Sequence, residues 1–206
     1  MNLSAMLTEF YARGFDYLND NGPGEVRATR WINQSYLEIC ELDDWPFLQA
    51  SSTAPLPATI SDLGTVESAT NTVTQSPIKF VDRRSLVDAY SDLTTLGSPL
   101  YGYITYGTTV NGYPVSSSEN VTVWYWKIPT ELTLTTDSPV MPARYHYAII
   151  DYACARAYMD SDNPDMAQAA RRDGEALVAM MRERLLTQQH QNTDEVVVYG
   201  YSSDAP

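Results

Sequence analysis

The stretch RWINQSYLEICELDDWPF, residues 30–47, contains the point at which one structural pattern ends and another begins. Its first half belongs to a run in which apolar residues recur at spacings of three and four: Ala28, Ile32, Tyr36, Ile39 and Cys40. This spacing is the apolar stripe of an amphipathic helix. The run ends at Asp43-Asp44-Trp45-Pro46, because the residue before a proline avoids the helical region. The sequence therefore predicts a helix over 25–42 and a different architecture after it.

Three further segments show helical periodicity. Residues 3–19 carry an apolar stripe and end at Asn21-Gly22-Pro23-Gly24. Pro142 opens a third helix that runs to a break at residues 160–163. Asn163 is placed to cap a fourth helix that begins at Pro164. The inner face of this last helix carries small residues such as Gly174, which predicts close approach to a neighbouring helix.

Between the helix pairs the sequence is typical of a β-rich module. Glycine, proline, serine and threonine are frequent there, and short β-branched and aromatic runs alternate with them. The clearest expected strands are 78–81, 100–106, 121–128 and 131–135. Val110-Asn111-Gly112-Tyr113 is a hairpin-turn signal, and Ser85 is placed to cap a short helical turn.

These patterns predict an α+β fold, in which an antiparallel bundle of about four helices carries an inserted small antiparallel β-module and an extended C-terminal tail. The helices on either side of the insertion must pack together, because nothing local can cover their apolar faces. The expected boundaries are 1–46 for the first half of the bundle, 47–140 for the insertion, 141–189 for the second half and 190–206 for the arm.

The arm contains an apolar strand-like segment with no strand beside it in sequence: Val196, Val197, Val198, Tyr199, Gly200 and Tyr201. Such a segment needs a sheet edge for its backbone hydrogen bonds, and another chain can supply that edge by strand addition. We expect the arm to become ordered only in an assembly.

Composition excludes several classes of protein. The net charge is -13, with 26 acidic and 13 basic residues, which disfavours stable binding to nucleic acid. No apolar run approaches the roughly 20 residues that cross a bilayer, and no signal-peptide pattern opens the chain, so we expect synthesis in a cytoplasm. Cys40 and Cys154 show no metal-binding or redox spacing and are expected to be buried and reduced.

The residues that catalysis requires are scarce. His146 lies between two tyrosines on a predicted helix, where a packed or interface role is favoured over that of a general base, and His190 lies in a polar segment. The phosphate-binding glycine loop needs a lysine, and the chain contains only Lys79 and Lys127. Residues 160–163 lack the glycine and glutamate of a calcium loop, so helix capping is favoured there. The sequence predicts no enzyme, no cofactor and no metal site.

The aromatic run Trp124-Tyr125-Trp126 is the clearest candidate interaction site outside the arm. Alternation on a strand places Trp124 and Trp126 on one face and Tyr125 on the other. We favour a core on the Tyr125 face and partner contact on the tryptophan face. Stacking on a sugar or base is the alternative.

Three segments together resemble head-to-tail adaptor proteins of tailed bacteriophages, also called connector or neck proteins. They are 30–40 running into 44–47, then Val81-Asp82-Arg83-Arg84-Ser85-Leu86, then Pro142-Ala143-Arg144-Tyr145-His146. The order of helices and insertion is similar to the layout of podovirus tail tubular protein A. These are packing motifs, not catalytic signatures.

The resemblance implies a virion protein of the head-tail junction that forms a ring, typically of twelve copies, between the portal protein and an adjacent neck or tail protein. It also implies that DNA passes through the ring without specific binding, which suits an acidic chain. The arm residues Val196 to Tyr201 would then contact the portal or a neighbouring subunit. The alternatives are another neck or tail component, such as a stopper or tail terminator, and a carbohydrate-binding module. That module would use Trp124, Trp126 and the tyrosines of Tyr101 to Tyr106 as stacking platforms.

Overall fold

The computed structural model describes residues 1–90, 92–116 and 118–193, and confirms the predicted α+β class. The chain divides into two compact units. We call residues 1–46 together with 132–193 the helical unit, and residues 47–131 the β unit. Each unit has its own core and is described by itself.

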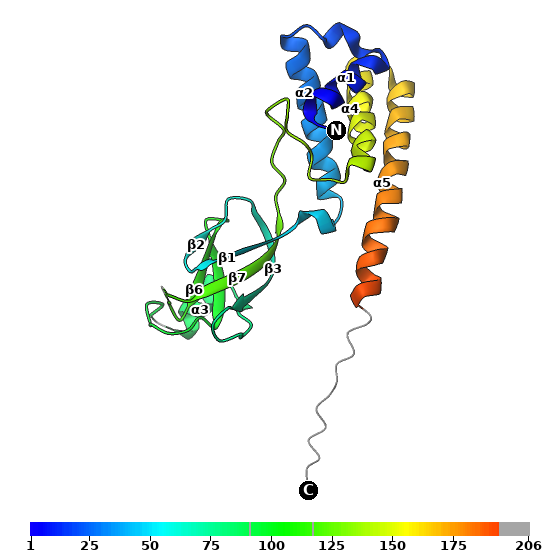
Figure 1. Ribbon diagram of the computed structural model, residues 1–206. Helices are drawn as coiled ribbons and strands as arrows, with labels where there is room; N and C mark the ends of the chain where they lie inside the picture. The colour runs from blue at the N-terminus through cyan, green and yellow to red at the C-terminus, as the bar shows by residue number, and fades with distance from the viewer. Residues whose placement is uncertain (91, 117, 194–206) are drawn as a thin grey trace. The chain divides into compact units, whose positions relative to one another are not determined.

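Four helices build the helical unit: α1 (Leu3–Phe10), α2 (Pro23–Glu41), α4 (His146–Asp160) and α5 (Pro164–Thr193). They come from both ends of the chain and lie side by side (Figure 1). Helix α4 is the central one, since its residues are buried on nearly every side, Ile149 and Ile150 completely. This is why its sequence shows a weaker polar stripe than that of α2.

The first helix is shorter than predicted. In place of one helix over 3–19, α1 ends at Phe10 and a π-helical turn, Tyr11–Phe15, follows it. Gly14 lies within that turn at φ +104°, a left-handed conformation that favours glycine and ends the helix. The turn folds Phe15 back onto Phe10, with ring centroids 4.6 Å apart. Apolar spacing continued through the break because both sides of it face the same core.

The junction between α4 and α5 forms as the sequence predicted. Asp162 adopts a positive φ of 53° in the break, and the Asn163 side chain accepts a hydrogen bond from the Met166 N–H at 3.3 Å. On α5, a Cβ atom built at Gly174 would lie 2.4 Å from Cδ2 of Tyr152, which no real side chain tolerates. Glycine therefore permits the close approach of α5 to α4.

Two small sheets build the β unit. One has the order β1-β7-β3 and the other β2-β6-β5-β4. The first contains β1 (Gln49–Pro55), β7 (Asn120–Lys127) and β3 (Leu63–Asn71), all antiparallel. The second contains β2 (Ala58–Thr59), β6 (Thr109–Tyr113), β5 (Tyr101–Thr105) and β4 (Lys79–Phe80), with β4 parallel to β5. A short helix, α3 (Arg83–Ala89), lies between β4 and β5 in sequence.

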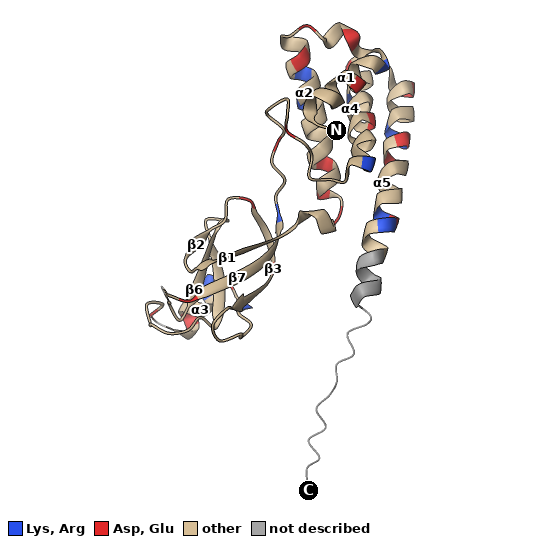
Figure 2. Cartoon of the chain, in the orientation of Figure 1, with Lys and Arg blue, Asp and Glu red and all other residues tan. Residues whose placement is uncertain are grey.

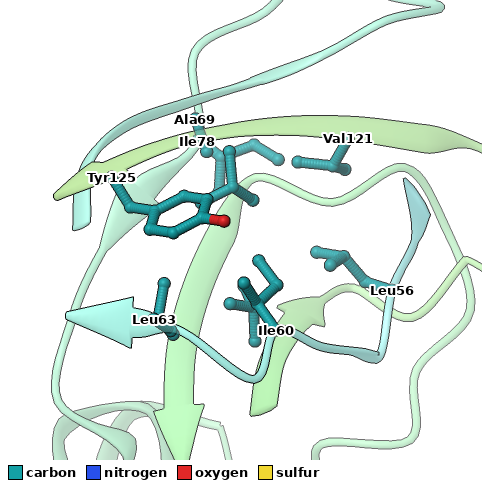
Figure 3. Packing of buried hydrophobic residues seen from close by; sticks show 9 residues of the cluster. Leu56, Ile60, Leu63, Ala69, Ile78, Val121 and Tyr125 are labelled. Carbon is teal, nitrogen blue, oxygen red and sulfur yellow. The ribbon is translucent and has the colours of Figure 1, made fainter. Parts of the chain in front are cut away.

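The β unit has a core of its own. Figure 3 shows side chains from separate segments converging there, with Val121 and Tyr125 of β7 facing Ile60 and Leu63. The complete buried cluster is Leu56, Ile60, Leu63, Ala69, Ile78, Val110, Val121, Val123 and Tyr125. The predicted strands 78–81, 100–106 and 121–128 correspond to β4, β5 and β7.

The predicted hairpin turn is wrong. Residues 110–113 lie inside β6, and the turn from β5 to β6 falls at Tyr106 and Gly107, which take positive φ values of 54° and 75°. Gly112 instead meets a packing need, because a Cβ there would lie 2.9 Å from Cδ1 of Leu56. The Asn111-Gly112 pair thus lies within a strand, and Tyr106 adopts the positive φ that the turn requires.

The predicted strand at 131–135 is also wrong, and its residues mostly join the other unit. The Asp137 carboxylate accepts hydrogen bonds from the N–H groups of Thr133 and Leu134, at 2.8 and 2.7 Å. Asn33 of α2 binds both backbone groups of Leu132, at 3.0 and 2.8 Å. Because side chains take up these backbone groups, no strand forms, and residues 132–140 pack with the helices, whereas the sequence analysis assigned them to the insertion.

The cap of α3 differs as well. Asp82, not Ser85, is the residue before the helix, and its carboxylate accepts a hydrogen bond from the Arg84 N–H at 3.0 Å. Ser85 lies inside the helix. Both residues suit a cap, and the helix starts at the earlier one.

Candidate interaction surface

Trp124 and Trp126 lie where alternation on β7 predicted. Trp124 is 48% exposed, and Trp126 is half-buried. Register places Ser51 of β1 and Ser68 of β3 on either side of Trp124. These small neighbours leave the indole uncovered beside a shallow groove of about 460 Å³, lined by Gln49, Ala50, Ser51, Glu67, Ser68 and Trp124.

The opposite face of β7 is core, as predicted. Val121, Val123 and Tyr125 are all buried there. The Tyr125 hydroxyl donates a hydrogen bond to the Asp62 carboxylate at 3.0 Å. Burial, and then this carboxylate, raise the pKa of the Tyr125 hydroxyl above its ordinary value. The tryptophan face is therefore the one available to a partner.

The other predicted contact residues, Val196, Val197, Val198, Tyr199 and Tyr201, lie outside the described residues. Their role in partner binding stays a prediction. The structure contributes the position from which they start, since α5 continues to Thr193.

An ionic cluster in the helical unit was not predicted as a site. Glu38 of α2 accepts hydrogen bonds from Arg156 at 2.6 Å and Arg171 at 2.7 Å. Arg171 also lies over the Tyr152 ring, 3.9 Å from its centroid. Burial alone would raise the pKa of the Glu38 carboxyl, but the hydrogen bonds and charges of the two arginines lower it below its ordinary value. The cluster thus ties α2, α4 and α5 together.

This ionic cluster borders an open cavity of about 710 Å³ in the helical unit. Trp31 and Met159 form apolar parts of its wall. Asp160, which also lines the cavity, forms an ion pair with Arg27 at 3.1 Å. The acids and arginines of the wall are largely paired with each other, so the cavity presents little net charge to a ligand. Sequence spacing showed only that Glu38 points away from the apolar stripe; its partners are more than 100 residues away.

His146 is packed, as the sequence analysis favoured. Its Nε2 donates to the Met141 carbonyl oxygen, and its Nδ1 accepts from the Met1 amino group, each at 2.8 Å. Burial lowers the pKa of the imidazole below its ordinary value. Both ring nitrogens are therefore occupied, which leaves neither available as a general base.

Cys40 and Cys154 are both buried, as predicted. Burial raises the pKa of the Cys154 thiol to about 12, so the reactive thiolate is scarce at neutral pH. Among the side chains that the structure describes, residues 1–90, 92–116 and 118–187, no group of three or more histidines, cysteines or carboxylates is placed to hold a metal ion. None of the helices described has the length and apolar character needed to cross a membrane.

The described residues thus form a helical bundle with an inserted β unit, and an aromatic face at Trp124 is exposed on the β unit. The sequence matches the SU10 adaptor protein family over residues 1–199, so the chain belongs to this family. Membership makes it a structural adaptor of a bacteriophage particle, found at the head-tail junction. No curated protein matches the chain.

Proposed function

We propose that this adaptor forms a ring between the portal and the next neck or tail component, and that DNA passes through the ring. The family match over 199 residues is the observation that carries the proposal, because it covers both units and most of the arm. A ring of twelve copies and a specific kinship with podovirus tail tubular protein A are part of the proposal. So is contact of the arm with the portal or a neighbouring subunit.

The distribution of charge supports a channel lined by the helical unit. Seven of the 26 acidic and four of the 13 basic residues lie at 47–131, whereas the helical unit, 1–46 with 132–193, carries 16 acidic and nine basic residues. Figure 2 shows charged residues spread along the helices, whereas β1 and most of β7 carry none. An acidic wall repels the DNA backbone, so the genome would slide without being held.

The test is a reconstruction of the phage particle by electron cryomicroscopy. We expect a ring of this chain directly below the portal, with the helical unit lining the channel. A position farther down the neck would favour a stopper or tail terminator. Density for this chain away from the head-tail axis would overturn the proposal.

The exposed Trp124 ring also fits a carbohydrate-binding module, since indoles stack on sugars. Titration of the protein with host cell-wall glycans distinguishes the two functions. Saturable quenching of tryptophan fluorescence that is lost in Trp124→Ala would favour glycan binding. An adaptor that uses this face for protein contact gives no such quenching.

A further inference from the structure

Strand β1 has an open backbone edge. It stands at the end of the sheet order β1-β7-β3 and pairs with β7 through seven consecutive residues without a register shift. A strand paired on one side turns the N–H and C=O groups of alternate residues away from its neighbour. Among the described residues, these outward groups of β1 have no backbone partner. The edge can therefore accept another strand.

The sequence of β1 does nothing to block this edge. Proteins usually protect free edges with charges, prolines or bulges. QASSTAP has no charged residue, and its proline is the last position, Pro55. The other edge strand of the sheet, β3, carries Glu67 and two register shifts, and the Ala69 carbonyl accepts a hydrogen bond from the Ile78 N–H at 2.9 Å. Of the two edges, β1 is the one left unprotected.

The two faces of β1 predict what an added strand should carry. On the inner face, Ala50, Ser52 and Ala54 are small and border the core of the β unit, so an added strand with apolar side chains there would extend that core. On the outer face, Ser51 stands between the edge and Trp124. Strands lie about 4.8 Å apart, so an aromatic ring on the added strand could reach the indole across this serine.

The arm of this chain has the required alternation. As an added strand, VVVYGY at 196–201 would present Val196 and Val198 on one face and Val197, Tyr199 and Tyr201 on the other, because side chains alternate along a strand. This segment of six residues is one residue shorter than β1. We propose that residues 196–201 of a second copy of the chain add as a strand to the outer edge of β1, with the valine pair over the small inner face and a tyrosine beside Trp124.

We take a second copy as the occupant because the proposed ring places copies of the chain next to one another and the arm is short. Val196 follows Thr193 by three residues, so the strand begins within about 11 Å of the end of α5. The contact would hold the helix end of one subunit near the β unit of the next. Repeated head to tail, such a heterologous contact builds a ring when the rotation from one subunit to the next closes. The inference rests on the proposed function and names how one subunit engages its neighbour.

The test uses a fluorescent peptide of residues 194–206 and the full-length chain carrying V196D/V198D, in which its own arm is disabled. We expect saturable binding by fluorescence anisotropy, and slower hydrogen exchange at residues 49–55 when the peptide is bound. A V196D/V198D peptide should bind more than tenfold more weakly, because the charges would lie against apolar core. The control peptide S202D/S203D has the same added charge beyond the strand and should bind normally.

The acceptor is tested with Trp124→Ala in the same full-length chain. Loss of an aromatic contact is expected to weaken peptide binding about three- to tenfold. Ile104→Ala is the matched control, since Ile104 is a similarly exposed apolar residue on β5, in the other sheet. Unchanged circular dichroism in both variants shows that each remains folded, and the exchange measurement at β1 decides the question if Trp124→Ala does not fold.

Three outcomes of the binding and exchange experiments would overturn the inference. They are the absence of saturable binding at millimolar peptide, binding of the peptide to purified portal but not to this chain, and arm protection in the intact chain that does not depend on concentration. A particle map with the ring in place but β1 unpaired would sink this inference and leave the proposed function intact. Peptide binding to β1, together with absence of the chain from the head-tail axis, would overturn the proposed function and leave this inference intact.

Discussion

The helical unit and the β unit differ in how far their backbone N–H and C=O groups are hydrogen-bonded within the unit. In the helical unit the backbone hydrogen bonds of α2, α4 and α5 form within each helix. Side chains bind further backbone groups: Asp20 accepts from the Gly24 N–H in the first turn of α2, and Asn33 binds Leu132 in the segment before α4. In the β unit, each sheet ends at edge strands, and β1 has no buried residue. A helix satisfies its own backbone, whereas an edge strand does not. A partner can thus meet the helices only through side chains, but it can join the β unit through backbone.

The prediction with the largest expected effect tests whether the two units have independent cores. Ile149 of α4 is completely buried in the helical unit, and Ile60 is 6% exposed in the core of the β unit. Each change to alanine should lower the free energy of unfolding by about 2–5 kcal/mol, through lost burial and the cavity left behind. Hydrogen exchange followed by mass spectrometry should show Ile149→Ala destabilising the helices and Ile60→Ala destabilising the strands.

The two variants control for each other, because the same side chain is removed from each core. If each variant accelerated exchange equally in both units, the units would unfold as one, and the comparison between them would fail.

The second prediction concerns how closely the helices approach. Gly174→Val would force its side chain against the Tyr152 ring, and overpacking of this kind costs about 1–3 kcal/mol. Ala176→Val is the matched control on an exposed face of α5 and should cost only about 0.5 kcal/mol of helix propensity. Urea unfolding followed by helical circular dichroism measures both. Equal midpoints for the two variants would contradict the close contact.

The helical unit was the more predictable from sequence. The stripes of α2 and the cap at Asn163 are local signals, so three- and four-residue spacing located both. One error in this unit, at Gly14, arose because apolar spacing ran through a break in the helix. The ionic partners of Glu38 were beyond prediction for a different reason. Packing brings Arg156 and Arg171 to it, and no local rule gives the pairing of distant helices.

The β unit was predicted only as a β-rich region, without its strand order. Its middle strand β7 was found because it is long and apolar, but β1 was not, because a run of serine, threonine and alanine resembles a loop. The partner of β1 is β7, about 70 residues later, so sheet order could not be inferred from neighbours in sequence. The exposed Trp124 face followed from alternation. The neighbours of Trp124, Ser51 and Ser68, could be identified only from the strand register, which the structure provides.

The third prediction tests the ionic cluster that joins the helices. Glu38→Gln removes the charge that two arginines share and should cost about 1 kcal/mol, since both arginines remain about a third exposed and water screens them. Glu175→Gln, which breaks one exposed pair with Arg171, should cost less. Because the pKa of Glu38 is lowered on folding, its contribution is present above about pH 4.5 and is lost as pH falls further. We therefore expect the urea midpoints of Glu38→Gln and the unchanged chain to differ at pH 7 and to lie closer together at pH 3.5.

The smallest effect at neutral pH belongs to His146, and it grows as the solution is acidified. Burial lowers the pKa of the imidazole, so below its ordinary pKa of about 6.5 the unfolded chain takes up a proton that the folded chain does not. Stability should therefore be unaffected above that pH and should fall between pH 6.5 and 5, by at most about 1.4 kcal/mol per pH unit. Urea midpoints across this range measure the slope, and His146→Asn should reduce it, whereas His190→Asn should leave it unchanged. An equal slope in His146→Asn would mean that the loss comes from other groups, and the buried histidine would then contribute nothing to the acid sensitivity of the helical unit.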